Sequence, residues 1–413
     1  MRPNPDGERV ALARGLGWGS GETLALLTLR ILPGIGDRRI ARLIRRHRSA
    51  RRVLGLPPDD RREALGVEAD RALQAPELSD RLRGIIDQCE CFQIRCVAMG
   101  APEYPPGLYA LVDPPPILFI RGSRPVANAR AVAVVGARKA TPAGRRMAER
   151  LGGDLSEAGV TVVSGMALGI DGAAHRGALH GPGGTIAVLG SGPDRAYPGG
   201  NRSLFEQVLA TGAVVSEFPP GEPARPFHFP RRNRVIAALS RAVVVVEARG
   251  RSGALITVDH ALDLGLEVFA VPGSVESRAS DGTNALIRDG AHLLTSAADL
   301  IETMGWDQSP TSRVPAEEQD RGGAPGAGPA GEGRAGSESR STPPEGPGDG
   351  DANLVASALG CAPRPVDDLV DELALPASRV LAALTRLELR GSAARAGDGW
   401  HRALPGRALP GAR

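Results

Sequence analysis

Four loops rich in glycine, serine and arginine have the residue types that bind anions. They lie in the stretches VVGARKATPAG, VVSGMALGIDGAAHRGAL, VLGSGPDRAYPGGN and EARGRSGALIT, each after an apolar segment and before or within a segment with helical spacing. At the carboxyl ends of parallel strands, such loops turn helix N-termini and backbone N–H groups toward a ligand. Gly136 and Arg138 belong to the first loop, and Gly190 and Gly192 to the third. The pattern predicts one anion-binding surface; alternatively, the glycines only make tight turns.

The stretch HFPRRNRVIAALS places four polar side chains directly ahead of apolar ones: Arg231, Arg232, Asn233 and Arg234. Burying several unpaired charges costs much free energy. We therefore expect all of these side chains at the edge of the domain, with the following apolar residues turned inward on a helix. That edge would be basic and would lie beside the loops, with Phe229 available to stack on a base. The alternative is a solvated run of charge.

No set of side chains has the spacing of a catalytic or cofactor site. The first loop lacks the GxGxxG fingerprint of dinucleotide binding, and no GxxxxGK[ST] phosphate loop occurs. Asp171 and His175 lie four residues apart on a predicted helix, but no third partner is spaced to join them. A capping aspartate and a packed or solvent-facing histidine are the simpler interpretation. We expect no catalytic residue, no metal and no cofactor.

The texture of the sequence changes along the chain. Before residue 90 it is helical, with two helices around a Pro-Gly-Ile-Gly turn between Leu26 and His47. From about residue 115, short β-branched segments alternate with helices: AVAVVGA, VTVVSGM, TIAVLGS, AVVSEF, AVVVVEA and LEVFAVPG. Their nearly continuous hydrophobicity is typical of a parallel sheet covered on both faces, so the sequence predicts a doubly wound α/β domain.

A stretch rich in glycine, proline, serine and charge, residues 309–351, separates this domain from the C-terminal part. It has too few large apolar residues to offset its ordering entropy, and we expect a disordered linker. The segment PRPVDDLVDELALPASRVLAALTRLELRGSAARAGDGWHRA then predicts helix, turn, helix and β-hairpin, a small winged-helix module. The residues expected along the inner face of its second helix are Val380, Leu381, Leu384 and Leu387.

Charge and cysteine content bound the function further. The net charge of +3 is modest and Lys139 is the only lysine, so an anionic partner must be met by clusters of arginine. Four cysteines in a chain this long do not make a disulfide framework and favour a reduced protein. With no signal sequence and no apolar run of about 20 residues, we expect a cytoplasmic protein and no membrane contact.

Taken together, these motifs resemble the DNA-processing protein A family (DprA, also called Smf). The matching pieces occur in order over about residues 113 to 291: DPPPILFIRG, the four loops, SEFPPG, HFPRRNRVIAALS and GTNALIRDGA. The resemblance implies an extended Rossmann-like domain that binds single-stranded DNA, protects incoming strands and loads RecA recombinase during natural transformation and recombination. It also implies a homodimer and no enzymatic activity.

By resemblance, Arg138 is a DNA-phosphate ligand, and Ser164, Gly165 and Asn233 line the same pocket. The predicted nucleic-acid-binding residues are Gly136, Arg138, Ser164, Gly165, Gly190, Gly192, Asn201, Phe229, Arg231, Arg232, Asn233, Arg234, Ser252 and Gly253. Family members often carry a lysine in the YPxxN motif, whereas this sequence has YPGGN.

An enzyme remains the alternative. The related nucleoside-monophosphate phosphoribohydrolases have a catalytic glutamate in a PGGxGTxxE motif, and Thr257 stands at the corresponding position here. That substitution favours binding over hydrolysis.

The resemblance also assigns the flanking parts. The predicted domains are a flexible N-terminus (1–20), a helical SAM-like or helix-hairpin-helix domain (21–90), the Rossmann-like DNA-binding domain (91–305), the linker (306–351), the winged-helix domain (352–405) and a tail (406–413). The stretch LPGIGDRRIARLIRRH resembles a helix-hairpin-helix phosphate binder, with a plain helical turn as the alternative. The winged helix has an acidic first helix, so a protein-contact or regulatory role there is at least as plausible as DNA binding.

Overall fold

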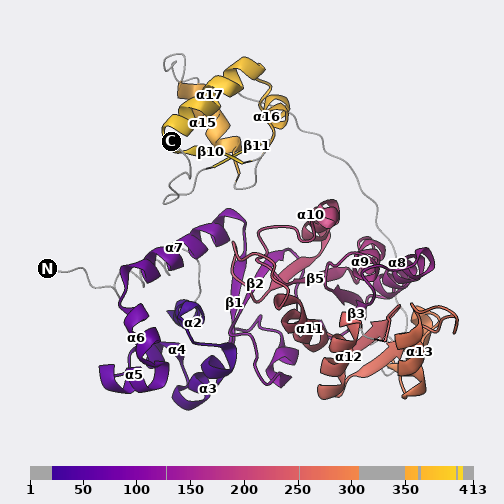
Figure 1. Cartoon of the computed structure of the whole chain (residues 1–413). Helices are drawn as coiled ribbons and strands as arrows, with labels where there is room; N and C mark the ends of the chain where they lie inside the picture. Colours follow the sequence, from indigo (N-terminus) through magenta and orange to yellow (C-terminus); the bar gives the residue numbers. More distant parts are fainter. Residues whose placement is uncertain are drawn as a thin grey trace, which may run out of the picture. The chain divides into compact units, whose positions relative to one another are not determined.

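The computed structural model describes residues 21–126, 128–250, 252–306, 349–360, 364–396 and 399–402. The chain divides into two compact units after Met304. The first holds a helical region and a nine-stranded sheet, and the second is a small helical module with a two-stranded sheet (Figure 1). In the described ranges, no helix is both long and apolar enough to cross a membrane. The predicted N-terminal segment, most of the predicted linker and the tail lie outside the described residues.

The large sheet confirms the predicted α/β fold class. Its strands follow the order β1-β2-β6-β5-β4-β3-β7-β8-β9. All pairs from β6 to β9 are parallel, whereas β1 and β2 form an antiparallel edge. The six predicted β-branched segments are β3 to β8. The strand bounds are β1 Arg95–Ala98, β2 Ile117–Gly122, β3 Ala131–Val135, β4 Thr161–Ser164, β5 Thr185–Leu189, β6 Ala213–Ser216, β7 Ala242–Val245, β8 Glu267–Ala270 and β9 His292–Leu293.

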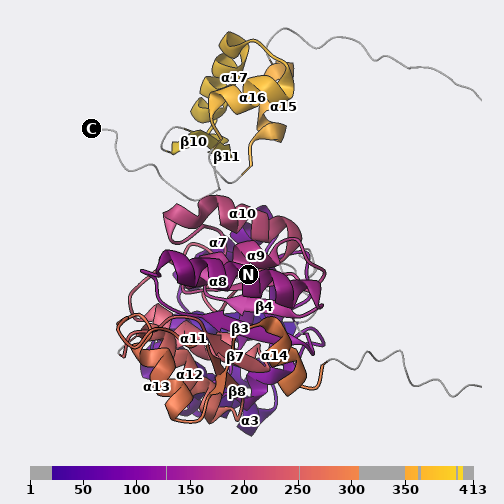
Figure 2. The same cartoon turned by 90° about the vertical axis from the view of Figure 1, so that its right-hand side faces the viewer.

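Helices cover both faces of the sheet because the chain winds first one way from β3 and then the other. Helices α8 and α9 lie on one face, and α11 and α12 lie on the other (Figure 2). Thr141 begins α8, since its side chain accepts a hydrogen bond from the backbone of Gly144 and Pro142 follows it. The helix bounds are α8 Pro142–Glu157, α9 Ile170–Ala178, α10 Arg202–Thr211, α11 His228–Ala238, α12 Gly253–Asp263, α13 Asp281–Arg288 and α14 Ala297–Thr303, with 3-10 turns η1 Pro106–Ala110 and η2 Gly199–Asn201.

Strand β2 joins the helical region to the sheet. Its side chains alternate between two cores: Ile117 and Phe119 pack with the N-terminal helices, whereas Leu118 and Ile120 pack with residues of α11 and α12. The N-terminal helices confirm the predicted helical texture. Their bounds are α2 Gly21–Ile31, α3 Asp37–His47, α4 Ala50–Leu54, α5 Pro58–Leu65, α6 Val67–Leu73 and α7 Pro76–Cys91.

The second unit has the predicted order of helix, turn, helix and hairpin. A further helix, α15, precedes these elements. The inner face of α17 includes Val380, Leu384 and Leu387, but Leu381 is 46% exposed, so its predicted inward placement is wrong. Leu381 follows Val380 by one position and therefore points about 100° away around the helix. The element bounds are α15 Asp349–Ala358, α16 Val366–Leu373, α17 Ala377–Leu389, β10 Ala393–Ala396 and β11 Gly399–Arg402.

Candidate nucleic-acid interface

The candidate site lies at the carboxyl edge of the parallel strands, where the winding direction reverses between β3 and β7. A parallel α/β sheet binds its ligands at such a switch point. The loops after β3, β4, β5 and β7 meet there, and they are the four loops predicted from the sequence. The N-terminal half of α11 lies against the same edge, because Arg232 reaches the backbone at both β4 and β5.

A buried carboxylate holds the loop after β3 in place. Glu247 accepts hydrogen bonds from the backbone and the hydroxyl of Thr141. A Cβ at Gly136 would come within 2.9 Å of the carbonyl of Glu247, so this position admits only glycine without a shift. The loop is thereby fixed while Arg138 and Lys139 stay exposed. Glu247, which positions the loop, opens the stretch EARGRSGALIT but was not among the predicted site residues.

Arg138 lies over an aromatic stack. Its guanidinium carbon is 5.0 Å from the ring centroid of Phe229. That ring stacks on Tyr197 at 5.5 Å and 29°. Gly190 makes room for the stack, because a Cβ there would lie 3.0 Å from Phe229. Phe229 is half-buried and Tyr197 is 45% exposed, so the stack ends in an open ring. Tyr197 lies in the YPGGN motif but was not among the predicted ligands.

The polar groups of the loop after β4 form hydrogen bonds with other groups of the protein. The hydroxyl of buried Ser164 donates to the carbonyl of Val134 at 2.6 Å. The backbone N–H of Gly165 donates to Asp171 at 3.1 Å, and that of Met166 to His175 at 3.3 Å. These N–H groups already have partners inside the protein. The expectation that this loop offers them to a phosphate is therefore wrong.

Burial shifts the pKa values of both side chains that hold this loop, Asp171 and His175. It raises the pKa of Asp171, although Arg232 and two backbone N–H groups oppose the shift. Burial, with Arg232 and Arg176 nearby, lowers the pKa of His175 to about 3. His175 is therefore a neutral, packed histidine, which is one of the two placements that the sequence left open.

Two of the predicted rim arginines are internal, which corrects the sequence-based placement. Arg232 and Arg234 are each 4% exposed. Arg232 donates to the carbonyls of Gly165 and Val188, and burial lowers its pKa to about 10. Arg234 donates to Glu217 at 2.6 Å. The prediction assumed unpaired charges, but the fold supplies acceptors to both guanidinium groups.

Arg231 and Asn233 also have structural contacts. Arg231, whose side chain is 34% exposed, forms ion pairs with Asp37 of α3 and with Glu217. It therefore joins the helical region to α11. The amide of Asn233 donates to the carbonyl of Gly253 at 3.1 Å and so ties α11 to the start of α12.

The remaining predicted residues divide between interior and surface. Gly192 and Asn201 are buried, and the amide of Asn201 donates to the carbonyl of Met166 at 2.9 Å. Ser252 begins α12 by accepting from the backbone of Ala254 at 3.4 Å. Gly253 is exposed, and a Cβ there would meet no atom within 4 Å.

The exposed side chains of this edge, with half-buried Phe229, form what we call the loop rim, defined as Arg138, Lys139, Tyr197, Phe229 and Arg249. Among the described residues, its cations make no side-chain hydrogen bond or ion pair; Arg138 has only its contact with Phe229. In the same ranges, no three His, Cys, Asp or Glu side chains lie close enough to hold a metal ion. The loop rim offers free positive charge beside a stacking surface.

Fold and rim together define an α/β protein with a basic edge that carries two stacked aromatic rings. The sequence model of the family described as DNA recombination-mediator protein A matches residues 95–305, and that of the DprA winged helix domain matches residues 339–399. The chain belongs to this DprA/Smf family, which confirms the resemblance seen in the sequence.

Individual relatives agree. The DNA processing protein DprA of Streptococcus pneumoniae is 44% identical over 198 residues, which are 48% of this chain and 70% of that protein. Protein Smf of a Synechocystis species is 36% identical over 305 residues, 70% of this chain and 75% of that protein. The X-ray structure of the pneumococcal protein covers 68% of this chain and 95% of its own, with 35% identity and a TM-score of 0.57.

Proposed function

We propose that the loop rim binds single-stranded DNA without sequence readout. The observation that carries this proposal is the stack of Arg138, Phe229 and Tyr197, flanked by unpaired cations. Cations hold phosphates in any sequence, and an aromatic ring stacks on any base.

The open ring favours a single strand over a duplex. A base can stack on Tyr197 only when it has left its own stack, which costs free energy in a duplex but little in a single strand. The buried residues of the predicted set have another role in this proposal. Arg232, Asn201 and Gly165 hold the loops in place, and they affect DNA through Arg138 and the rings rather than by contact.

Family membership supports the wider role. We propose that the protein protects incoming single strands and loads RecA recombinase on them in natural transformation and recombination, acting as a homodimer in the cytoplasm. On this proposal it is a binding protein and no enzyme.

One observation weighs against a nucleotide hydrolase. Thr257, at the position where the hydrolase motif has its glutamate, is 1% exposed within α12. The buried Asp171 and His175 are already held by loop backbone groups. Neither offers a substrate an accessible acid or base.

A competition assay tests the proposal. The full-length protein is given labelled single-stranded DNA with unlabelled single-stranded or duplex competitor, and nucleoside-monophosphate hydrolysis is measured in parallel. We expect single strands to compete best and no turnover. Arg138→Ala should weaken binding, whereas Arg241→Ala should not, because Arg241 is exposed at the opposite edge of the sheet, directly before β7. Turnover without DNA retention would overturn the proposal in favour of the hydrolase.

A further inference from the structure

A second basic surface lies on α3, away from the loop rim's own elements. Four arginines of this helix and one apolar side chain line a groove of about 680 Å³, which we call the α3 groove: Arg38, Arg42, Arg45, Arg46 and Val112. All four arginines are exposed, and Val112 is 74% exposed. The sequence singled out this segment as a possible phosphate binder, but the proposed function does not use it.

The four arginines of the α3 groove have no acidic partner among the described residues and lie together on one helix. Elsewhere in the helical region, Arg30 pairs with Asp37 and Arg61 with Asp70. Within the part of the chain that the structure describes, these arginines form one side-chain hydrogen bond, a weak one from Arg45 to the carbonyl of Ala41 at 3.4 Å. Like charges gathered on one helix face repel each other unless an anion joins them. The surface is therefore suited to a polyanion.

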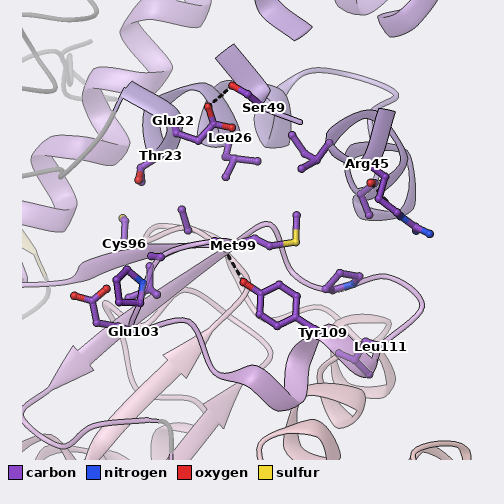
Figure 3. Close-up of a pocket in the computed structure, with 18 of the residues that line it drawn as sticks. Glu22, Thr23, Leu26, Arg45, Ser49, Cys96, Met99, Glu103, Tyr109 and Leu111 are labelled. Carbon is purple, nitrogen blue, oxygen red and sulfur yellow. Dashed lines mark hydrogen bonds between the residues drawn. The ribbon is translucent and has the colours of Figure 1, made fainter. Parts of the chain in front are cut away.

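The α3 groove continues into a larger cavity of about 1450 Å³, because Arg45 and Val112 line both. Figure 3 shows this cavity between the N-terminal helices, which supply Glu22 and Arg45, and the segment that carries Met99 and Tyr109. The carboxylate of Glu22 is already engaged, since it accepts from Ser49 at 2.7 Å and from the backbone at the start of α4.

Tyr109 gives the cavity an exposed aromatic face. Its side chain is 51% exposed, and its hydroxyl accepts a hydrogen bond from the backbone of Gly100 at 2.9 Å. Its ring lies 5.0 Å from that of Tyr104. The hydroxyl and the neighbouring ring both fix the orientation of Tyr109, so a base that stacks on it would not have to order it first.

We infer that the α3 groove and this cavity form a second contact surface for the polynucleotide. Phosphates bind the arginines of α3, and an unpaired base lies against Tyr109. Arg38, Arg42 and Arg46 repeat every four residues, and at 1.5 Å per residue they span about 12 Å of one helix face. That length allows contact with more than one phosphate of an extended strand. This inference rests on the proposed function and lengthens the DNA footprint beyond the loop rim.

The first test compares two double variants of the full-length protein. Arg42→Ala with Arg46→Ala removes two groove charges, and Arg71→Ala with Arg83→Ala removes two exposed charges elsewhere in the helical region. Binding of oligothymidylates from about 5 to about 40 nucleotides is measured over a range of salt concentrations. In the groove variant, we expect the slope of log affinity against log salt concentration to fall in magnitude by about 1.4. The number of nucleotides occluded by each protein should also fall, and the affinity for long oligonucleotides should decrease more than the affinity for short ones.

The outcomes separate the two proposals. If both double variants behave alike while Arg138→Ala weakens binding, the groove holds no DNA and the proposed function stands. If the unsubstituted protein binds no oligonucleotide, both proposals fall.

Photocrosslinking tests the position of the base. A 5-iodouracil oligonucleotide bound to the full-length protein should form an adduct with Tyr109. The adduct should be retained in the control variant with Arg71→Ala and Arg83→Ala, and it should be lost in Tyr109→Ala. Adducts at the loop rim alone would overturn the placement of a base in the cavity.

Discussion

Two arginine-rich helices of this protein use the same side chain in opposite ways. In α11, Arg232 and Arg234 are each 4% exposed and donate to carbonyls and to Glu217. In α3, Arg42 and Arg46 are exposed and have no ion pair in the described ranges. The two segments, HFPRRNRV and DRRIARLIRRH, look alike as runs of charge. What separates them is whether the fold brings acceptors to the guanidinium groups.

The comparison shows where binding energy is available. An arginine that is already bonded to protein acceptors gains little from a phosphate, because it would first lose those partners. An exposed arginine without a partner gives up only water and counterions. We therefore assign DNA contact to the loop rim and the α3 groove, and assign to α11 the task of holding the loops.

Removing a buried arginine should have the largest effect. Arg234→Met removes the shorter ion pair of buried Glu217, at 2.6 Å, and leaves it paired with Arg231 at 3.2 Å. We expect a loss of about 3 kcal/mol in the free energy of unfolding. Chemical denaturation measures it. Arg42→Met on α3 serves as the control and should change stability by less than about 0.5 kcal/mol. Similar losses in the two variants would abolish the distinction between the two helices.

A companion variant sharpens this test. Glu217→Gln with Arg234→Met removes both charges, so it should recover part of the stability lost by Arg234→Met alone. No recovery would mean that the packing of Arg234, rather than its charge, holds the site.

The loop rim should behave in the reverse manner. Tyr197→Ala removes the open ring of the stack, and we expect the affinity for single-stranded DNA to fall by about 1–3 kcal/mol with the fold intact. Fluorescence anisotropy with a labelled oligonucleotide measures the affinity. Tyr197→Phe keeps the ring and should bind as the unsubstituted protein does. Equal affinity of Tyr197→Ala and the unsubstituted protein would remove the ring from the interface.

The sequence predicted the framework better than the side-chain environments. The six parallel strands and four loops follow from β-branched runs and glycine spacing, which are local signals. Strands β1 and β9 were missed because they are short strands defined by pairing at the two edges of the sheet, and β9 has only two residues. Strand β2 lies between β1 and β6 and was missed although its ILFI run is apolar.

The buried arginines could not be predicted because their partners are distant in sequence. Glu217 lies 17 residues before Arg234, and the carbonyl of Gly165 lies 67 residues before Arg232. Nothing in a local pattern of charge reveals such acceptors. For the same reason, the sequence could not tell which of the clustered arginines remain free for DNA.

The folding stability should depend on pH through buried His175, whereas the DNA affinity of the loop rim should not. His175 has a pKa of about 3 in the folded protein, below its ordinary value of about 6.5, so the unfolded chain binds the extra proton between these values. The stabilisation is complete above about pH 6.5 and decreases as the pH falls toward 3. At about pH 5 this residue alone should cost about 2 kcal/mol relative to about pH 7.5.

Denaturation at several pH values checks this expectation. His175→Gln should flatten the pH dependence over this range relative to the unsubstituted protein, whatever its effect at neutral pH. DNA affinity of the folded protein should stay nearly constant over the same range, because arginine and lysine do not titrate there. An unchanged pH dependence in His175→Gln would show that another group controls it.

The smallest effect is expected at Asn233. This residue tests the distinction between side chains of α11 that hold the loops and exposed side chains that contact DNA. Its amide donates to Gly253 and its oxygen accepts from Arg232 at 3.3 Å, so Asn233→Ala should cost about 1 kcal/mol of stability. DNA affinity should change little, because the contacts that it loses lie within the protein. A large loss of affinity at unchanged stability would instead make Asn233 a DNA ligand, as its sequence motif implied. A residue of α11 would then contact the single-stranded DNA. The distinction between structural side chains in α11 and DNA-binding side chains elsewhere would then hold only for the arginines.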